Sequence, residues 1–297
     1  MFLKAFCESH HHPSMFPLVL MYKHVRQPQL DARQSKKGFH FHDWNEIVFI
    51  HEGEGLFFIN NRFLDFKGGD ILTIPGNSIH RGSSSPDAPY IVSVILFSSS
   101  LINPSQVGDT FSFMDLFTAT EHSPSYLLRL QSEHKQEIEA HLASMQHELV
   151  SLQPGHRLSV LNALHHIMLL LLRIRKMESG LTPAKESKNN IWMKEILKYM
   201  DEHLHENLSL SLLAKQALIS PAHFSRVFSQ LTGFSIPEYL NIKRILKAKE
   251  LLAETDQPVS YIADQCGFNS ISHFHKIFKS HVHMTPANFR EHRGQSG

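Results

Sequence analysis

Cysteine is scarce in this chain: Cys7 and Cys266 are the two cysteines in 297 residues. Two thiols so far apart in the sequence exclude a disulfide framework and a metal cluster built on thiolates. We therefore expect a protein of the reducing cytoplasm.

The sequence also lacks an excess of charge and a long hydrophobic run. Its 29 Lys and Arg nearly balance 28 Asp and Glu, so net charge alone does not point to nucleic acid. The most apolar stretch, Leu164 to Ile174, contains His165 and His166 and is too short to span a bilayer. The opening MFLKAFCESHHHP becomes polar too early for a secretory signal. We expect no membrane association, and the length leaves room for two globular domains.

What is present, from about residue 18 to residue 98, is a series of short apolar runs. EIVFI, LFFI, DILTI and YIVSVILF alternate with the turn-forming stretches HEGEG, INNR, FKGGD and PGNS. Short strands with such regular turns are typical of an antiparallel sandwich or a small barrel.

A helical pattern follows after about residue 120. Apolar residues recur close to every 3.6 positions from Tyr126 to Leu152, and a second helix is predicted from His156 to about Met177. The second helix is apolar around most of its circumference, so the barrel or a second subunit must cover it. The polar stretch ESGLTPAKESKNN that follows, 178–190, predicts an interdomain linker.

Two segments of the C-terminal third, 209–232 and 259–282, repeat one another about fifty residues apart. The matched pairs are Ala214 with Ala263, Ser220 with Ser270, His223 and Phe224 with His273 and Phe274, Arg226 with Lys276, Phe228 with Phe278, and, just beyond, Pro237 with Pro286. A duplicated helix-turn-helix explains this repetition economically.

Each repeat has the signals of a helix that could enter a DNA groove. Ser220 followed by Pro221 is a strong helix start, and Gly267 suits a tight turn in the second repeat. Apolar residues fall on one face, and the other carries small, polar or basic residues, as major-groove binding requires. A helix beginning near Ser235 would hold the two recognition helices roughly 34 Å apart, one turn of DNA. A plain helical bundle with a solvated basic face explains the matched pairs less well.

Residues 191–293 resemble the DNA-binding domain of the AraC/XylS family of regulators. The resemblance covers about a third of the chain and includes residues of the connecting helix and of the second repeat: Tyr239, Leu240, Arg244, Ala248, Leu251, Leu252, Ile262, Ala263, Gly267, Phe268, Phe274, Phe278, Lys279, Thr285, Pro286 and Arg290. It implies base contacts by Ala222, Ser225, Arg226, Ile271, Ser272, His273 and Lys276. Leu218 and His283 stand where the family usually has glycine, and Ile271 could face either a thymine methyl or the core.

The N-terminal region contains a second motif. The segments HFHDWNE and GGDILTIPGNSIH resemble the two cupin motifs and supply His40, His42, Glu46 and His80. On an extended strand the first three share parity and can point into the barrel. They could bind a divalent metal such as iron, manganese or zinc, anchor an organic effector, or form an inert polar core. Because the arrangement is similar to sugar-responsive family members, a carbohydrate is the preferred effector.

The sequence thus predicts an α+β multidomain regulator. A cupin-like effector-binding barrel (1–120), a helical dimerisation segment (121–178), a linker (179–190) and an all-α DNA-binding domain (191–297) follow one another. Its expected partners are double-stranded operator DNA, a small-molecule effector, a second copy of the chain and, for an activator, RNA polymerase. The main alternative is a metal-dependent cupin enzyme with a DNA-binding appendage. A DNA-alkylation repair protein is rejected, because that chemistry needs more thiolates than two cysteines supply.

Overall fold

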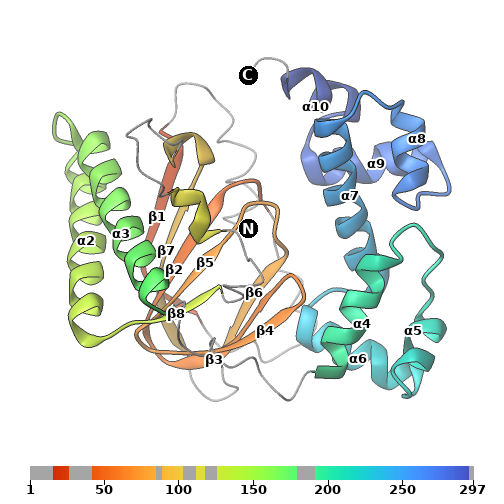
Figure 1. Ribbon diagram of the computed structural model, residues 1–297, viewed down its shortest axis with the longest axis horizontal. Helices are drawn as coiled ribbons and strands as arrows, with labels where there is room; N and C mark the ends of the chain where they lie inside the picture. Colours follow the sequence, from red (N-terminus) through yellow and green to blue (C-terminus); the bar gives the residue numbers. More distant parts are fainter. Residues whose placement is uncertain are drawn as a thin grey trace. The chain divides into compact units, whose positions relative to one another are not determined.

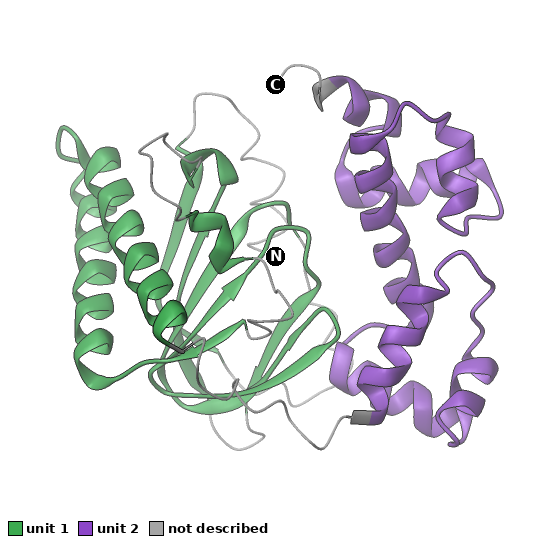
Figure 2. Ribbon diagram, in the orientation of Figure 1, with its two compact units in different colours: residues 1–187 green, residues 188–297 purple. Residues whose placement is uncertain are grey.

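The computed structural model describes residues 16–26, 42–84, 89–102, 112–117, 126–178 and 191–293. The chain divides into two compact units, 1–187 and 188–297 (Figure 2). This division falls within the predicted linker 179–190, which itself lies outside the described residues.

The N-terminal unit contains two antiparallel sheets (Figure 1). The larger sheet has the order β1 (Leu18–Arg26), β7 (Tyr90–Phe97), β2 (Asn45–Glu52), β5 (Asp70–Ile74) and β8 (Leu127–Arg129). The smaller sheet has the order β4 (Arg62–Lys67), β3 (Glu54–Ile59) and β6 (His80–Ser84). All four apolar runs identified in the sequence form strands, so that prediction is confirmed.

The two sheets enclose one core and helices cover the outside of the larger sheet. Val48, Ile50 and Leu72 of the larger sheet meet Phe57 and Leu64 of the smaller one in the barrel interior. The alternate residues of the larger sheet point outward into a second core with α2 (Ser132–Ser151) and α3 (His156–Glu178); this core includes Ile47, Phe49, Ile95, Ile138, Leu142, Leu164 and Met168. The short 3₁₀ helices η2 (Ser99–Ile102) and η3 (Phe113–Leu116) border it.

Helix α3 explains the most apolar stretch of the sequence. It is the one helix among the described residues that is long and apolar enough to cross a membrane. Val160, Leu164, Ile167 and Leu171 are nevertheless buried against the barrel and α2, which accounts for its hydrophobicity.

The prediction that a helix begins at Tyr126 was wrong. Residues Leu127–Arg129 form β8, which pairs with the edge of β5, and α2 begins at Ser132. Leu127 points into the barrel interior and Leu128 into the outer core, which is the alternation of a strand. Pairing with an open sheet edge therefore overrode the helical spacing of Leu127 and Leu130.

The C-terminal unit is all helical. Its helices are α4 (Ile191–Glu202), α5 (Leu210–Gln216), α6 (Pro221–Thr232), α7 (Ile236–Glu254), α8 (Val259–Gln265), α9 (Ile271–Val282) and α10 (Pro286–Arg293). Helices α5 and α6 form the first helix-turn-helix and α8 and α9 the second, with α7 between them (Figure 1). Ser220 and Ser270 cap α6 and α9 through Oγ, which accepts the backbone N–H of His223 and His273.

Candidate DNA interface and barrel-interior site

Helices α6 and α9 bury their aromatic residues and expose the residues predicted to contact DNA. Phe224 and Phe228 in α6, and Phe274 and Phe278 in α9, are fully buried. The two helices expose Ala222, Ser225, Arg226, Ile271, Ser272, His273 and Lys276. All seven side chains are therefore available to a partner.

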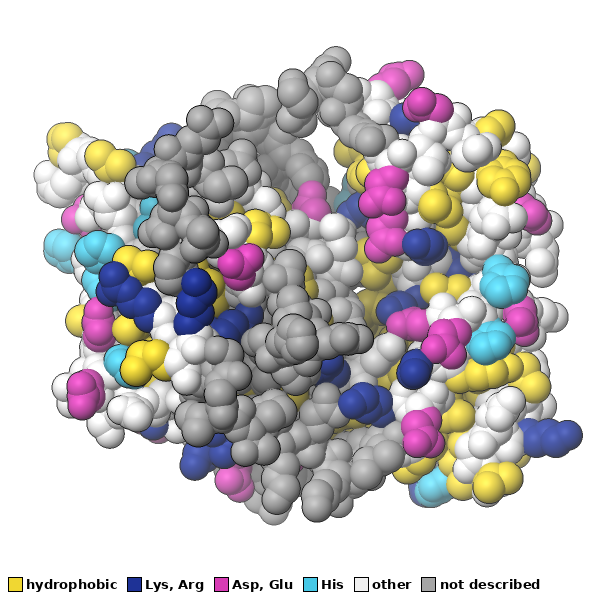
Figure 3. Space-filling view, in the orientation of Figure 1, with side chains coloured by type: hydrophobic (Ala, Val, Ile, Leu, Met, Phe, Trp, Pro, Cys, Tyr) yellow, Lys and Arg dark blue, Asp and Glu magenta, His cyan; other side chains and the backbone are white. Residues whose placement is uncertain are grey.

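Ile271 is the first residue of α9 and 42% exposed, although its position three residues before Phe274 places it on the same side of the helix as the buried aromatic residues. Arg226 is also exposed, and its Nη2 donates to His223 Nδ1 at 3.0 Å, which orients the guanidinium one turn from the start of α6. Over the face in Figure 3, basic and acidic side chains of the C-terminal unit are interspersed, in line with the nearly neutral composition.

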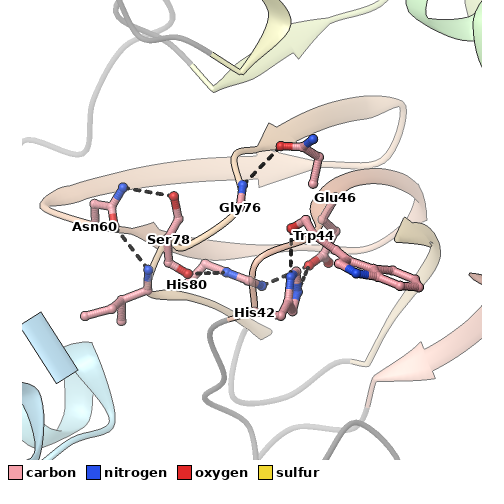
Figure 4. A network of polar contacts seen from close by, with 9 residues as sticks. His42, Trp44, Glu46, Asn60, Gly76, Ser78 and His80 are labelled. Carbon is pink, nitrogen blue, oxygen red and sulfur yellow. Dashed lines mark hydrogen bonds and ion pairs between the residues drawn. The ribbon is translucent and has the colours of Figure 1, made fainter. Parts of the chain in front are cut away.

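Inside the barrel, three of the four predicted residues meet (Figure 4). Glu46 lies on β2, His42 precedes that strand, and His80 begins β6 on the opposite sheet. Glu46 Oε2 is 3.2 Å from His42 Nε2 and 2.9 Å from His80 Nε2. All three side chains are buried. We call these residues the interior trio.

Backbone carbonyls orient both histidines of the interior trio. His42 Nδ1 donates to the carbonyl oxygen of Trp44 at 2.8 Å, and His80 Nδ1 donates to that of Ser78 at 3.0 Å. Because each Nδ1 carries a proton, each Nε2 of a neutral ring would present a lone pair to Glu46. Each lone pair would repel the Glu46 carboxylate. A proton on Nε2, or a cation between the three groups, removes this repulsion.

The charges within the interior trio favour an ion pair. Burial would raise the pKa of the Glu46 carboxyl, but the charge of His80 and hydrogen bonds from both histidines hold that pKa well below its usual range. Burial alone would lower the pKa of His80, whereas the Glu46 carboxylate raises it. Both directions favour a Glu46 carboxylate beside a protonated His80 when no cation lies between them.

Comparison with known families identifies both units. Residues 29–168 match the AraC-like ligand binding domain, and residues 213–292 match a helix-turn-helix domain. The chain belongs to the AraC family of transcriptional regulators. This AraC-family chain is therefore a DNA-binding regulator with a ligand-binding barrel, and the predicted fold class and family resemblance are confirmed.

The relatives of this AraC-family protein are transcription regulators. The HTH-type transcriptional activator RhaS of Enterobacter sp. (strain 638) is 25% identical over 269 residues, which cover 86% of this chain and 88% of RhaS. The regulatory protein PocR of Salmonella typhimurium is 32% identical over 114 residues, 38% of each chain. Among solved structures, the DNA-binding domain of AdpA in complex with a target DNA is 33% identical; the match covers 34% of this chain and 93% of that domain, with a TM-score of 0.34.

The fourth predicted member of the barrel site, His40, lies outside the described residues of this AraC-family chain. Sequence reasoning missed the asparagines that support the site. Asn60 Oδ1 accepts the N–H of Ile79, and its Nδ2 donates to Ser78 Oγ, while Asn45 Oδ1 accepts the N–H of Gly76. The stretch INNR was identified as a turn, but its link to His80 through Ser78 had no signal in the sequence.

Proposed function

We propose that this AraC-family regulator is an activator that binds operator DNA with α6 and α9 in successive major-groove segments. The observation that carries the proposal is the exposure of matched side chains on two helices with the same serine cap, Arg226 in α6 and Lys276 in α9. A basic side chain that reaches guanine makes the commonest specific base contact. The RhaS relative is named a transcriptional activator, which supports activation, with RNA polymerase as a partner.

Operator selection tests this proposal directly. The full chain is incubated with a random duplex library, bound sequences are amplified and sequenced, and the selected site is assayed by fluorescence anisotropy. Two half-sites about 10–10.5 base pairs apart are expected for one protomer. Enrichment of sequences without any such periodic pair would contradict the placement of both helices in the groove.

The regulator is proposed to act as a homodimer in the cytoplasm, with domains at 1–120, 121–178 and 191–297 joined by the linker 179–190. The end of α2, the connecting turn and the start of α3 expose three apolar side chains, Val150, Leu152 and Leu158. Exposed apolar residues that are clustered indicate a contact surface, and a second copy of the same segment is the simplest partner.

For the barrel, we propose a small polyhydroxylated effector, a carbohydrate, bound at the interior trio and His40. The Glu46 carboxylate accepts hydrogen bonds from hydroxyls, and the two histidines on either side of it add polar contacts. A thermal-shift panel of neutral sugars, sugar acids and polyols on the full chain tests the proposal. A sugar that raises the Tm of the wild type, but not of the His42→Ala/His80→Ala variant, is the expected result. A shift that is unchanged in the variant would place the effector elsewhere.

A divalent metal is the second candidate ligand of the interior trio. It is favoured by the two Nδ1–H groups bound to carbonyls, because this pattern leaves each Nε2 as a metal ligand beside a carboxylate oxygen. Elemental analysis of protein purified without a histidine tag separates the candidates. Near-stoichiometric metal that is lost in the double variant would support a metal site, and turnover of a small substrate by the loaded protein would support the enzyme alternative.

A further inference from the structure

Two β-bulges flank Ser93 in the larger sheet, on the face covered by α2. The register of β1 against β7 shifts between Met21 and His24, and that of β2 against β7 shifts between Ile50 and Glu52. Lys23 in the first bulge has a left-handed backbone, and His51 is the unpaired residue of the second. Bulges re-aim side chains and often mark functional positions.

A chain of polar contacts runs from one bulge through the other to helix α2. The Lys23 N–H donates to Ser93 Oγ at 3.0 Å, and Ser93 Oγ lies 2.8 Å from His51 Nε2. His51 Nδ1 donates to Glu139 Oε1 on α2 at 3.1 Å. Because Nδ1 carries the ring proton, Nε2 accepts the Ser93 hydroxyl, and each group in the chain has a partner of the right kind.

Ser93, His51 and Glu139 follow one another in the order serine, histidine and carboxylate that is found around a nucleophilic serine. The burial of Ser93 excludes this catalytic use. The accessible surface of Ser93 is 0%, so no substrate can reach its hydroxyl. Around the chain the interface is apolar: the Phe49 ring packs edge-on against His51 at 4.8 Å, and Ile138 and Leu142 of α2 are buried. The link ends at the rim of this interface, because the His51 side chain is 5% exposed and the Glu139 side chain is 48% exposed.

Strand β2 connects this link with the interior trio. Glu46 and His51 lie on the same strand, Glu46 directed into the barrel and His51 directed toward α2. One turn before Glu139, the Lys135 side chain packs directly over Gly69 in the turn that precedes β5, and the Gly69 N–H donates to Ile50 O. Lys135 and Glu139, one turn apart on α2, thus contact the turn bonded to β2 and the end of β2 itself.

We propose that His51 is a positioning residue of the regulatory response. Through Ser93 and Glu139 it fixes α2 on the barrel and passes a rearrangement of the interior trio to the helix proposed to form the dimer. The inference rests on the proposed function, in which the barrel interior holds the effector and α2 and α3 hold the partner subunit.

Hydrogen–deuterium exchange of the full chain tests the inference without an identified effector, because a substitution perturbs the interior directly. Glu46→Gln should change the exchange rate of α2 amides by about 2- to 30-fold, the range by which mutations between coupled sites act. The same change should have less than a twofold effect in a Glu139→Ala background. Glu139→Gln should preserve the response, because its amide oxygen still accepts from His51 Nδ1.

Glu137→Ala is the matched control, because Glu137 is an exposed glutamate on the same helix. It should leave the response to Glu46→Gln intact. His80→Gln supplies a second interior perturbation if Glu46→Gln fails to fold. A response of α2 that persists in Glu139→Ala, or the lack of any response to either interior variant, would overturn the proposal. DNA is absent from this experiment, so its failure leaves the proposed operator binding untouched, whereas failed operator selection leaves the exchange result interpretable.

Discussion

At the scale of single residues, the two helix-turn-helix units place different residue types at the same left-handed backbone position. The turn before each recognition helix needs a left-handed residue, which is Leu218 with φ of 57° in the first unit and Gly267 with φ of 81° in the second. A Cβ on Gly267 would lie 2.5 Å from the carbonyl oxygen of Leu204, so only glycine fits there. Leu218 is 91% exposed and meets no such obstacle, which explains how the first unit departs from the family pattern.

We therefore expect opposite effects from substitutions at these matched positions. Leu218→Gly should raise the free energy of unfolding by about 0.5–1 kcal/mol, because relief of left-handed strain exceeds the added entropy of the unfolded chain. Gly267→Ala should lower it by about 2 kcal/mol or more, through strain and the clash with the backbone. Calorimetry of the full chain, following the transition of the C-terminal unit, measures both. Destabilisation by Leu218→Gly would mean that the leucine has a packing role.

Base reading also depends on individual side chains. Arg226→Ala should cost about 1–3 kcal/mol of affinity for the selected operator and relax the preference at one base pair. The fold should be unaffected, because Arg226 is exposed opposite Phe224 and Phe228. Anisotropy titrations of Arg226→Ala and Lys276→Ala, with Lys198→Ala on α4 as control, measure the losses. An equal loss on random and operator DNA would show that the side chain contacts phosphate alone.

At the scale of elements, the sequence was sufficient to predict a helix or a strand where the local signals agreed. The serine caps and the apolar faces predicted α6 and α9, and the apolar runs between turn residues predicted the four strands. The alternation of side chains along a strand predicted that Glu46 points into the barrel. Local spacing failed for Leu127 and Leu130, because the free edge of β5 decided their structure. The contacts between His51, Ser93 and Glu139 join residues 42 and 88 positions apart, and no periodicity encodes such distances.

The contact between β2 and α2 should also affect the pH dependence of stability. Burial lowers the pKa of His51, although Glu139 opposes the shift. A histidine that stays neutral in the folded state takes up its proton on unfolding, so stability is lost as pH falls below the unfolded pKa of about 6.5. His51→Gln should weaken the fall of the free energy of unfolding between pH 6.5 and 5, by at most about 1.4 kcal/mol per pH unit. His24→Gln is a comparison, because its pKa is lowered without a link to α2. A steeper fall in His51→Gln than in the wild type would contradict this assignment.

At the scale of the whole molecule, the division into two units means that regulation in the proposed homodimer would depend on how the two DNA-binding domains are held together. Each unit has its own buried core, and the core of the C-terminal one includes Ile245, Leu252, Phe274 and Phe278. An effector that changes the proposed dimerisation segment would alter the population of dimers able to contact both half-sites, without altering the recognition helices themselves.

This division predicts that a fragment lacking residues 1–190 folds, remains monomeric and still recognises the operator, but more weakly than the full chain. The fragment keeps both helix-turn-helix units and the helix between them, so its specificity should persist. It loses α2 and α3, the helices proposed to link two copies of the chain. Two linked domains bind a two-site operator with a higher effective concentration, and losing this advantage should lower the affinity by about 10²- to 10⁴-fold. Sedimentation velocity and anisotropy on one-site and two-site duplexes measure both properties, and the one-site duplex serves as control because linkage gives no advantage there. A full-length chain that sediments as a monomer at micromolar concentration, with and without the two-site duplex, would remove the basis for this prediction.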